Sequence, residues 1–353
     1  MRVLSPFLKR VMYPALSSVG FPRYYAREGR FCVITYHGVR PAGYVSIDPA
    51  LDGGLVTAES FRRQIRWLKS QFNIVSPREV RQWLADEQKL PPRAVLLTCD
   101  DGLANVVTEM IPILKSEAVT CLFFITAASA ASAASMLWYE ELYLMLLSAK
   151  GATVHLGHLE LGEKVVERDT IRQSWWRIVQ TLSRLEERPR YAVLDDIREA
   201  CGLPENWFSQ CLNDEPNRQR FLRLTADELK TLLAADMTIG AHSLSHPVLP
   251  KMVDALAWAE IEQSAKLIEE AIGTSIWSFA YPFGDQTSVT DRETKMAEKA
   301  GYECAFVNFD GGFGSHIERF SIPRVHVTAD MRLGEFAAHV CGFHNALRRW
   351  IGR

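Results

Sequence analysis

The fold of this chain is most constrained by short apolar runs that alternate with amphipathic helical patterns. Runs rich in β-branched and aromatic residues occupy residues 30–39, 94–102, 120–126, 237–243, 277–284, 302–307 and 319–327. Apolar residues at helical spacing lie between them, as in residues 60–72 and 254–273. Strands that are apolar on both faces and separated by helices are typical of a parallel sheet covered on both sides or closed into a barrel. We therefore predict an α/β fold, a distorted seven-stranded (β/α) barrel.

The alternation is interrupted after the third strand. A linker of small residues, AASAASAAS, begins at Ala127, and mainly helical patterns follow it through Phe221. A capping-box pattern from Thr225 to Glu228 then restarts the core. The predicted organisation is an amphipathic basic segment at 1–29, the first part of the barrel at 30–126, a mainly helical insertion at 127–222, the second part of the barrel at 223–328 and a C-terminal amphipathic helix at 329–353.

Composition narrows the classes of function. A formal net charge of −2 gives no electrostatic argument for nucleic acid as a partner. The seven cysteines include no C-x-x-C pair, so neither a disulfide framework nor a cysteine zinc site is indicated. No apolar run is long enough to span a bilayer, and the first residues lack the continuous apolar core of a signal peptide. We therefore expect a cytoplasmic location.

Both ends of the sequence are basic and amphipathic. Such patterns are typical of terminal helices that pack on the body of a protein, which is the interpretation we favour. The alternative is a peripheral contact with the inner face of a membrane through basic ends that contain aromatic residues.

Polar side chains stand at the ends of two predicted strands. Asp100 and Asp101 end the second strand, and His242 and His246 follow the fourth. Two histidines and a carboxylate make a donor set that holds a catalytic divalent metal with open positions. Neighbouring strand residues point to opposite sides, so one aspartate can be a ligand while the other stays free as a base.

Each motif also has a structural interpretation. An Asp-Asp-Gly sequence is often a turn whose aspartate caps a helix, and Gly102 suits such a turn. Histidines four residues apart recur by chance. The two motifs together, each at the end of an apolar strand, favour a functional site.

These motifs resemble those of a known family. LTCDDG resembles the TFDDG motif, HSLSH resembles the HSxxH motif, and FAYPFGD and ITYHGV resemble further motifs of the polysaccharide deacetylase (NodB-homology) family of carbohydrate esterases. The resemblance covers residues 31–327 without the insertion. It implies a hydrolase that removes an N-acetyl group from an amino sugar and releases acetate.

The resemblance also implies roles for individual residues. Asp100 would be the general base that activates water, and Asp101, His242 and His246 would bind one divalent metal, usually zinc. The metal would polarise the acetyl carbonyl and stabilise the tetrahedral oxyanion.

The sequence departs from the family pattern at Ala280, where many members carry an arginine that orients the base. Arg324 is a candidate for that role from the last strand, although it could be an ordinary ion-paired arginine. His326 is a candidate for the family's late catalytic histidine. Because it lies two residues after Arg324 on the same strand, both side chains should point to the same side.

Four further residues are candidates for substrate binding. Tyr281 is expected at the pocket wall, and Pro282 and Phe283 are expected to shape a rigid loop near the acyl group, although the aromatic residues could belong to the core. His37 could line the pocket or be a satisfied histidine near a helix cap.

Three hypotheses about function remain. The first is a metal-dependent N-deacetylase acting on a saccharide or a lipid-linked amino sugar during surface-polysaccharide assembly. The second, motivated by Ala280, is a non-catalytic saccharide-binding protein on a degenerate deacetylase scaffold. The third is a metal hydrolase of another acyl bond.

Overall fold

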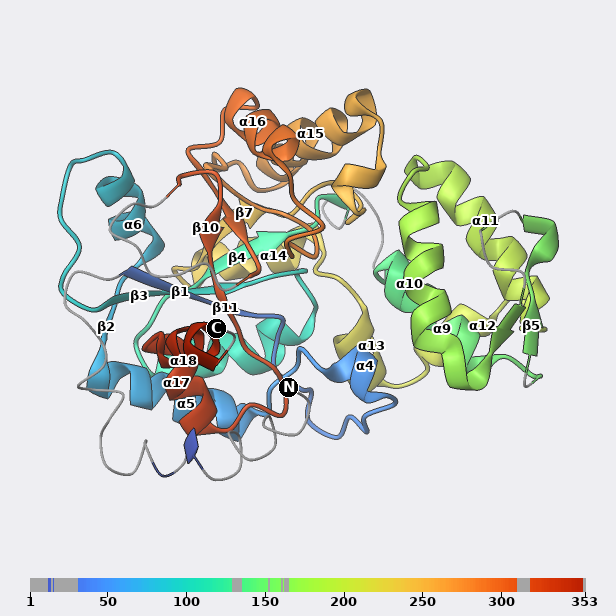
Figure 1. The fold of residues 1–353 in the computed structure, drawn as a ribbon, viewed down its shortest axis with the longest axis horizontal. Coiled ribbons are helices and arrows are strands. Elements are labelled where there is room, and N and C mark those ends of the chain that lie inside the picture. The colour runs from blue at the N-terminus through green and yellow to red at the C-terminus, as the bar shows by residue number, and fades with distance from the viewer. Residues whose placement is uncertain are drawn as a thin grey trace.

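A nine-stranded parallel sheet curled into a nearly closed barrel forms the body of the protein (Figure 1). The computed structural model describes residues 31–128, 135–151, 153–159, 161, 165–309 and 318–351, together with residues 12, 13 and 15. The strands are β1 (Phe31–Tyr36), β2 (Asn73–Ile74), β3 (Ala94–Cys99), β4 (Leu122–Ile125), β7 (Thr238–Ala241), β8 (Ser278–Ala280), β9 (Cys304–Val307), β10 (Ile322–Pro323) and β11 (Val325–His326). Their order is β10-β9-β8-β7-β4-β3-β1-β11, with β2 beside β3. The predicted fold class, a distorted (β/α) barrel, is confirmed.

The last strand segment joins the two edges of the sheet. β10 pairs with β9, and β11 pairs with β1. Only Arg324 lies between β10 and β11. The predicted seventh strand is therefore divided in two, and the path through the sheet has eight strands instead of seven. Each half forms only a short ladder, because one segment has to reach both edges.

Helices surround the barrel. They are α4 (Pro49–Asp52), α5 (Ala58–Gln71), α6 (Pro77–Leu84), the π-helical turn η2 (Val106–Met110) with α7 (Ile111–Ser116), α14 (Ala226–Ala234), η5 (Leu249–Lys251), α15 (Asp254–Ile272), α16 (Asp291–Lys299), α17 (Leu333–Val340) and α18 (Phe343–Ile351). The predicted capping box between Thr225 and Glu228 opens α14, and this prediction is confirmed. The single C-terminal helix predicted at 329–353 is instead two helices, because Gly342 has a φ of 79° and turns the chain between them.

Strand side chains alternate between two apolar layers, which explains the continuous apolar runs. In β3, Val95 and Leu97 pack in the outer layer under the helices. Leu96 faces the barrel interior in one cluster with Phe124 and Phe306, whose ring centroids are 5.2 Å apart. Complete burial of such side chains contributes about 1.5–3 kcal/mol each, so the barrel is a packed core and not a channel.

The chain between β4 and β7 forms a mainly helical unit with its own apolar core, drawn in green in Figure 1. Its elements are α9 (Trp138–Ser148), β5 (Thr153–His155), η3 (Gly157–Leu159), β6 (Val165–Glu167), η4 (Arg168–Thr170), α10 (Ile171–Leu182), α11 (Glu187–Ala200), α12 (Trp207–Cys211) and α13 (Glu215–Phe221). β5 and β6 form a small antiparallel hairpin. We call this unit the insertion.

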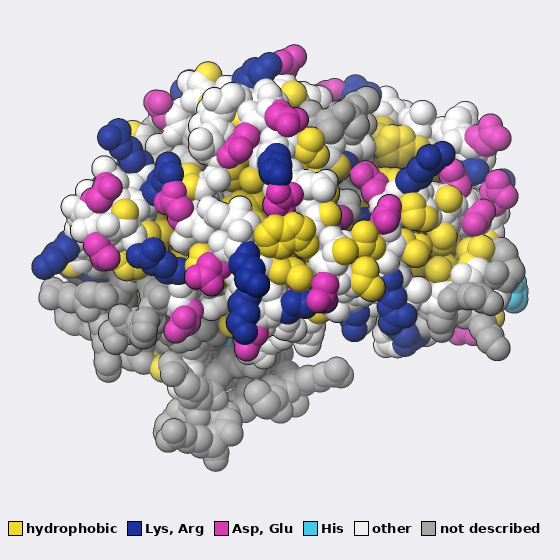
Figure 2. Space-filling view, turned by 90° about the horizontal axis from the view of Figure 1, so that it is seen from above, with side chains coloured by type: hydrophobic (Ala, Val, Ile, Leu, Met, Phe, Trp, Pro, Cys, Tyr) yellow, Lys and Arg dark blue, Asp and Glu magenta, His cyan; other side chains and the backbone are white. Residues whose placement is uncertain are grey.

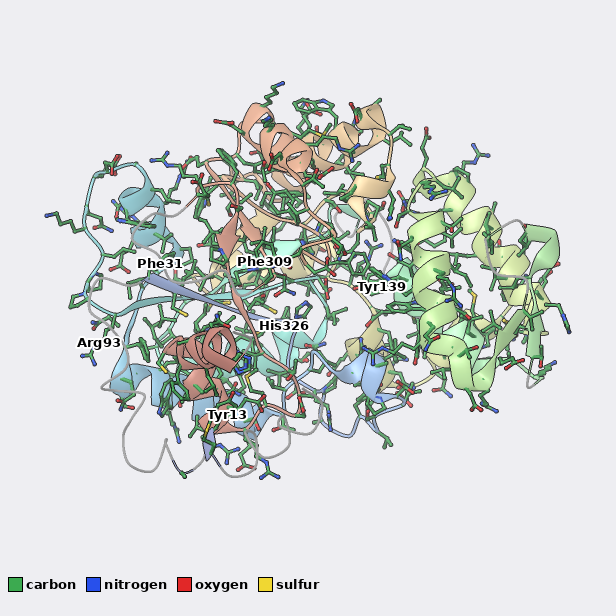
Figure 3. All side chains as sticks on the ribbon, viewed as in Figure 1. Tyr13, Phe31, Arg93, Tyr139, Phe309 and His326 are labelled. Carbon is green, nitrogen blue, oxygen red and sulfur yellow. The ribbon has the colours of Figure 1, made fainter. Side chains whose placement is uncertain are left out.

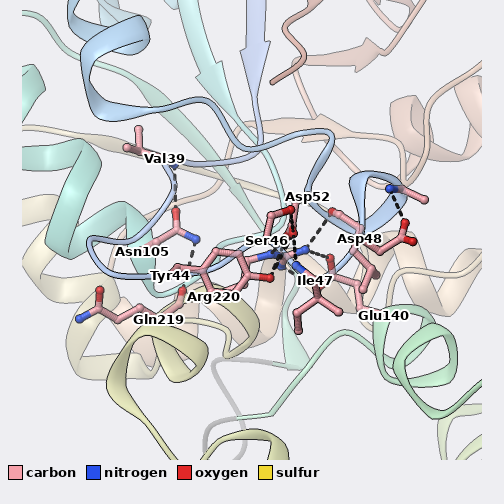
Figure 4. Close-up of polar contacts among 12 residues, drawn as sticks. Val39, Tyr44, Ser46, Ile47, Asp48, Asp52, Asn105, Glu140, Gln219 and Arg220 are labelled. Atoms are coloured by element: carbon pink, nitrogen blue, oxygen red, sulfur yellow. Dashed lines mark hydrogen bonds and ion pairs between the residues drawn. The ribbon is translucent and has the colours of Figure 1, made fainter. Parts of the chain in front are cut away.

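A buried ion-pair network ties the insertion to the barrel (Figure 4). Arg220 on α13 donates to Asp52 on α4 at 2.8 Å and to Glu140 on α9 at 2.7 Å. Tyr44 and Ser46 donate their hydroxyl groups to the Asp52 carboxylate at 3.1 and 2.6 Å. A buried arginine shared by two carboxylates fixes the relative position of the three helices that supply them.

Charges of both signs are interspersed on the face seen in Figure 2, with apolar side chains between them. Among the described residues, no helix combines the length and the hydropathy needed to cross a bilayer. The amphipathic basic segment predicted at 1–29 lies outside the described residues, apart from positions 12, 13 and 15.

Candidate functional site

The two aspartates lie in a tight turn that leaves the C-terminal end of β3. The Asp100 amide donates to the Tyr36 carbonyl at 2.9 Å, which continues the ladder with β1 for one more residue. Asp101 then has a φ of 73° and Gly102 a φ of 70°. This left-handed turn ends the alternation of the strand, so both buried carboxylates line one cavity.

Arg324 forms a bidentate ion pair with Asp100. Its Nη1 and Nη2 atoms donate to Oδ1 and Oδ2 at 2.7 and 2.6 Å, and its Nε donates to the Val307 carbonyl at 3.2 Å. Burial alone would raise the pKa of Asp100, but the guanidinium of Arg324 outweighs it and holds that pKa below its usual value. Asp100 is therefore ionised at neutral pH.

The histidines at the end of β7 face the second aspartate. The Nε2 atoms of His242 and His246 lie 3.5 and 3.3 Å from Asp101 Oδ1. His242 Nδ1 is 2.7 Å from the Ala280 carbonyl and donates to that oxygen, so Nε2 is the ring nitrogen that faces Asp101. The chain turns sharply here, since Ser243 and His246 have φ values of 62° and 60°.

These three residues fit a divalent metal. Their candidate donor atoms all lie within 4.8 Å of one another and all three side chains are buried. Two imidazole nitrogens and one carboxylate oxygen suit zinc and other first-row divalent ions. The hydrogen bond between His242 and the Ala280 carbonyl is the kind of outer contact that orients a metal-ligating histidine.

Burial and neighbouring charges shift the pKa values of these three residues in different directions. Burial would raise the pKa of Asp101, but hydrogen bonds from both histidines hold it well below its usual value. Burial would lower the pKa of His242, yet the bond to Asp101 raises it overall. The pKa of His246 is lowered by burial and by its neighbour His242. A negative oxygen between two imidazole rings is the result, which favours a cation at this point.

A cavity of about 710 Å³ joins the two groups of residues. Seven of the predicted residues line it: His37, Asp100, Asp101, His242, His246, Phe283 and His326. Arg324 is not part of the lining, because its side chain lies behind Asp100 with 1% of its surface exposed. The cavity thus contains the candidate base and the candidate ligands side by side.

His37 and His326 form one wall of this cavity, with ring centroids 4.8 Å apart. His37 Nδ1 and His326 Nε2 are buried and lack a hydrogen-bond partner among the described residues. Burial, together with the nearby His37, lowers the pKa of His326 to about 3. His326 is therefore a neutral imidazole at pH 7, with a nitrogen available to a ligand.

Comparison with known proteins finds similarity to deacetylases. A family model described as polysaccharide deacetylase matches residues 171–305, which include both histidines. Poly-beta-1,6-N-acetyl-D-glucosamine N-deacetylase of Escherichia coli (strain K12) is 23% identical over 314 residues, which are 88% of this chain and 38% of that protein. The putative polysaccharide deacetylase YxkH of Bacillus subtilis (strain 168) is 24% identical over 117 residues, 33% of this chain and 41% of that one. The chain is thus similar to polysaccharide deacetylases over residues 171–305. It spans 38% of the length of the Escherichia coli relative.

Solved structures of deacetylases share the fold. The Streptococcus pyogenes deacetylase PplD, in complex with acetate, superposes with a TM-score of 0.55 at 14% identity, over 89% of this chain and 99% of that one. IcaB from Ammonifex degensii gives a TM-score of 0.53 at 17% identity, over 88% of this chain and 97% of that one. The barrel fold is therefore shared with these solved structures.

The expectation that Tyr281 forms the pocket wall is wrong. Tyr281 does not form the pocket wall: it is 0% exposed, packs in the outer layer with Phe279, and donates its hydroxyl to the Phe320 carbonyl at 3.0 Å. Residues two apart on a strand point the same way, so Tyr281 follows Phe279 to the helix side. Pro282 is also buried and outside the cavity lining, while Phe283 contacts the His246 ring with centroids 4.7 Å apart.

The insertion also contributes side chains to the cavity. Tyr139 on α9 and Arg172, Trp175 and Trp176 on α10 line it. Tyr139 stacks near His246, with centroids 4.8 Å apart. In Figure 3 the labelled Tyr139 lies where the insertion meets the barrel, and the labelled His326 lies within the barrel. The aromatic pairs of α9 and α10 were visible in the sequence, but nothing local showed which side faces the barrel.

Proposed function

We propose that this chain is a metal-dependent deacetylase that hydrolyses the N-acetyl group of an amino sugar in a saccharide. The observation that carries the proposal is the adjacency, in one cavity, of an ionised base and a three-residue cation site. Asp100 is held ionised by Arg324, and Asp101, His242 and His246 present their donor atoms beside it. The family match and the structural likeness to deacetylases support the same activity.

The residues of the chain divide the chemistry between them. A divalent cation held by Asp101, His242 and His246 would polarise the acetyl carbonyl and make water more acidic. Asp100 accepts a proton from the attacking water, whose oxygen bonds to the carbonyl carbon. The carbon–nitrogen bond then breaks, and Asp100 returns its proton to the leaving amine. His326 is neutral before the reaction. We therefore propose that it forms a hydrogen bond with the substrate and does not act as the initial proton donor.

The substrate is an N-acetylated amino sugar, as supported by the named activity of the Escherichia coli relative. We propose further that the sugar belongs to a lipid-linked intermediate of surface-polysaccharide assembly, reached at the cytoplasmic face of a membrane. The basic amphipathic patterns near both ends of the sequence support this location. Cosedimentation with anionic vesicles, and not with neutral ones, is the expected result. Recovery of equal amounts of the protein in the supernatants of the anionic and the neutral vesicles would contradict the membrane contact.

The activity is tested by acetate release. The purified protein, loaded with zinc, is incubated with β-1,6-linked N-acetylglucosamine oligomers and with O-acetylated sugars. We expect equal amounts of acetate and free amine from the N-acetyl substrate, and loss of both after chelation. Acetate from the O-acetyl sugars alone would indicate hydrolysis of another acyl bond. Saccharide binding without acetate release in the zinc-loaded protein would identify a non-catalytic binding protein.

A further inference from the structure

The loop that carries His246 is held by two side chains of the insertion. Trp138 on α9 donates its Nε1 hydrogen to the carbonyls of Ser245 and His246, at 2.9 and 3.3 Å. Arg190 on α11 donates from Nη1 to the Ser245 hydroxyl oxygen at 2.9 Å. Trp138 and Arg190 are 2% and 0% exposed, so these bonds are shielded from water.

The barrel holds the same loop from the opposite side. Glu260 on α15 accepts hydrogen bonds from the amides of Leu244 and Ser245, both at 2.9 Å, and from the Ser245 hydroxyl at 2.5 Å. The guanidinium of Arg190 lies 4.7 Å from the ring centroid of Trp138. Ser245 is thus the shared point of a buried network that joins the insertion, the loop and the barrel.

His246 depends on this network more than His242 does. Its φ of 60° is costly for a residue with a side chain, about 1–2 kcal/mol, and persists only where surrounding contacts impose it. Its Nδ1 has no hydrogen-bond partner among the described residues, whereas that of His242 bonds the Ala280 carbonyl. The direction of the His246 ring is therefore set by its backbone and by its aromatic neighbours.

We infer that the insertion is part of the metal centre, and that Trp138 and Arg190 are positioning residues that hold His246 in ligating geometry. The inference rests on the proposed metal site. Without the two bonds from Trp138, the strained turn can relax and carry the imidazole away from Asp101. Loss of such outer contacts typically weakens metal binding by about 10–100-fold.

The test uses Trp138→Phe, which keeps an aromatic ring and removes the donor. Trp207→Phe is the matched control, because Trp207 is a buried residue of the same apolar core and has no hydrogen bond to the loop among the described residues. The dissociation constant for zinc is measured on the full chain by competition with a chromophoric chelator. We expect zinc binding about 10-fold weaker in Trp138→Phe and unchanged in Trp207→Phe.

A second pair of variants covers the case in which Trp138→Phe fails to fold. Ser245→Ala removes the hydroxyl shared by Arg190 and Glu260, and Ser264→Ala removes a buried hydroxyl of α15 that bonds Tyr302 and not the loop. Only Ser245→Ala should weaken zinc binding. Wild-type affinity in Ser245→Ala or Trp138→Phe would overturn the inference, as would equal losses in a variant and its control. A wild-type protein that binds no zinc would instead contradict the proposed metal site.

Discussion

Arg324 and Asp100 form a bidentate ion pair across 224 positions of sequence, with both bonds shorter than 2.8 Å. Arg324 occupies the single position between β10 and β11, where the barrel closes. The residue that holds the candidate base ionised therefore lies at the point where the barrel closes. This pairing links the folding of the last strands to the chemistry of the first motif.

Replacement of Arg324 by methionine should change the pH dependence of deacetylation. The strongest influence that opposes the effect of burial on the pKa of Asp100 would then be lost, so this pKa should rise, and a base must be deprotonated to act. The acid limb of the kcat/KM profile should move to higher pH, with about a tenfold loss for each unit by which the pKa exceeds the assay pH. Arg324→Lys keeps the charge and should shift the limb less. If kcat/KM fell by the same factor at every pH, so that the shape of the pH profile was unchanged, this role of Arg324 would be contradicted.

Substitutions of the two neighbouring aspartates should have different effects on zinc content and on turnover. Asp100→Asn removes the base and leaves the three candidate ligands in place, so zinc content should remain while kcat falls about 10²–10⁴-fold. Asp101→Asn removes the shared negative oxygen between the histidines, so zinc itself should be lost. Metal content by elemental analysis and acetate release are measured on the same preparations. Retention of zinc by Asp101→Asn would exclude it as a ligand.

The buried network around Arg220 should contribute strongly to stability. Arg220→Met leaves Asp52 and Glu140 as unpaired buried carboxylates, which costs about 3–5 kcal/mol. Arg218→Met is the control on the same helix, because Arg218 pairs with the exposed Glu215 and such pairs contribute about 0–1 kcal/mol. Free energies of unfolding from urea titration give both values. If both variants lost a similarly small amount of unfolding free energy, the network would not be what holds the insertion against the barrel.

Substitution of Gly102 should destabilise the protein, because Gly102 lies in the turn that carries Asp100 and Asp101. An alanine there would combine a φ of 70° with a Cβ atom 2.9 Å from Ile125 Cδ1. Gly273→Ala is the control, with a φ of 69° and open space around the added carbon. Left-handed backbone alone costs about 1–2 kcal/mol, so Gly273→Ala should lose that amount and Gly102→Ala more. Chemical denaturation measures both, and equal losses would show that the contact with Ile125 relaxes freely.

Local patterns in the sequence were sufficient for the barrel and for the position of the motifs. Continuous apolar runs predicted buried parallel strands, and Thr225 with Glu228 predicted the start of α14. These features depend on neighbouring residues, whose spacing is printed in the sequence. The motifs of Asp100 and His242 also follow their strands directly, so their common location at one end of the barrel followed from the fold.

Other features depend on contacts between distant residues. Tyr281 was predicted to form the wall of the pocket but faces the helices. Strand alternation defines two faces but does not say which of them faces the cavity. The division of the last strand at Arg324 also required knowledge of both sheet edges.

The sequence by itself determined the fold class, the strand ends and the kinds of side chain available for chemistry, because periodicity and turn chemistry act over a few residues. Only the tertiary structure decided that Arg324 faces Asp100 and that Trp138 and Arg190 hold the His246 loop. Those contacts join segments far apart in the chain, and their existence depends on how the barrel closes and how the insertion packs against it.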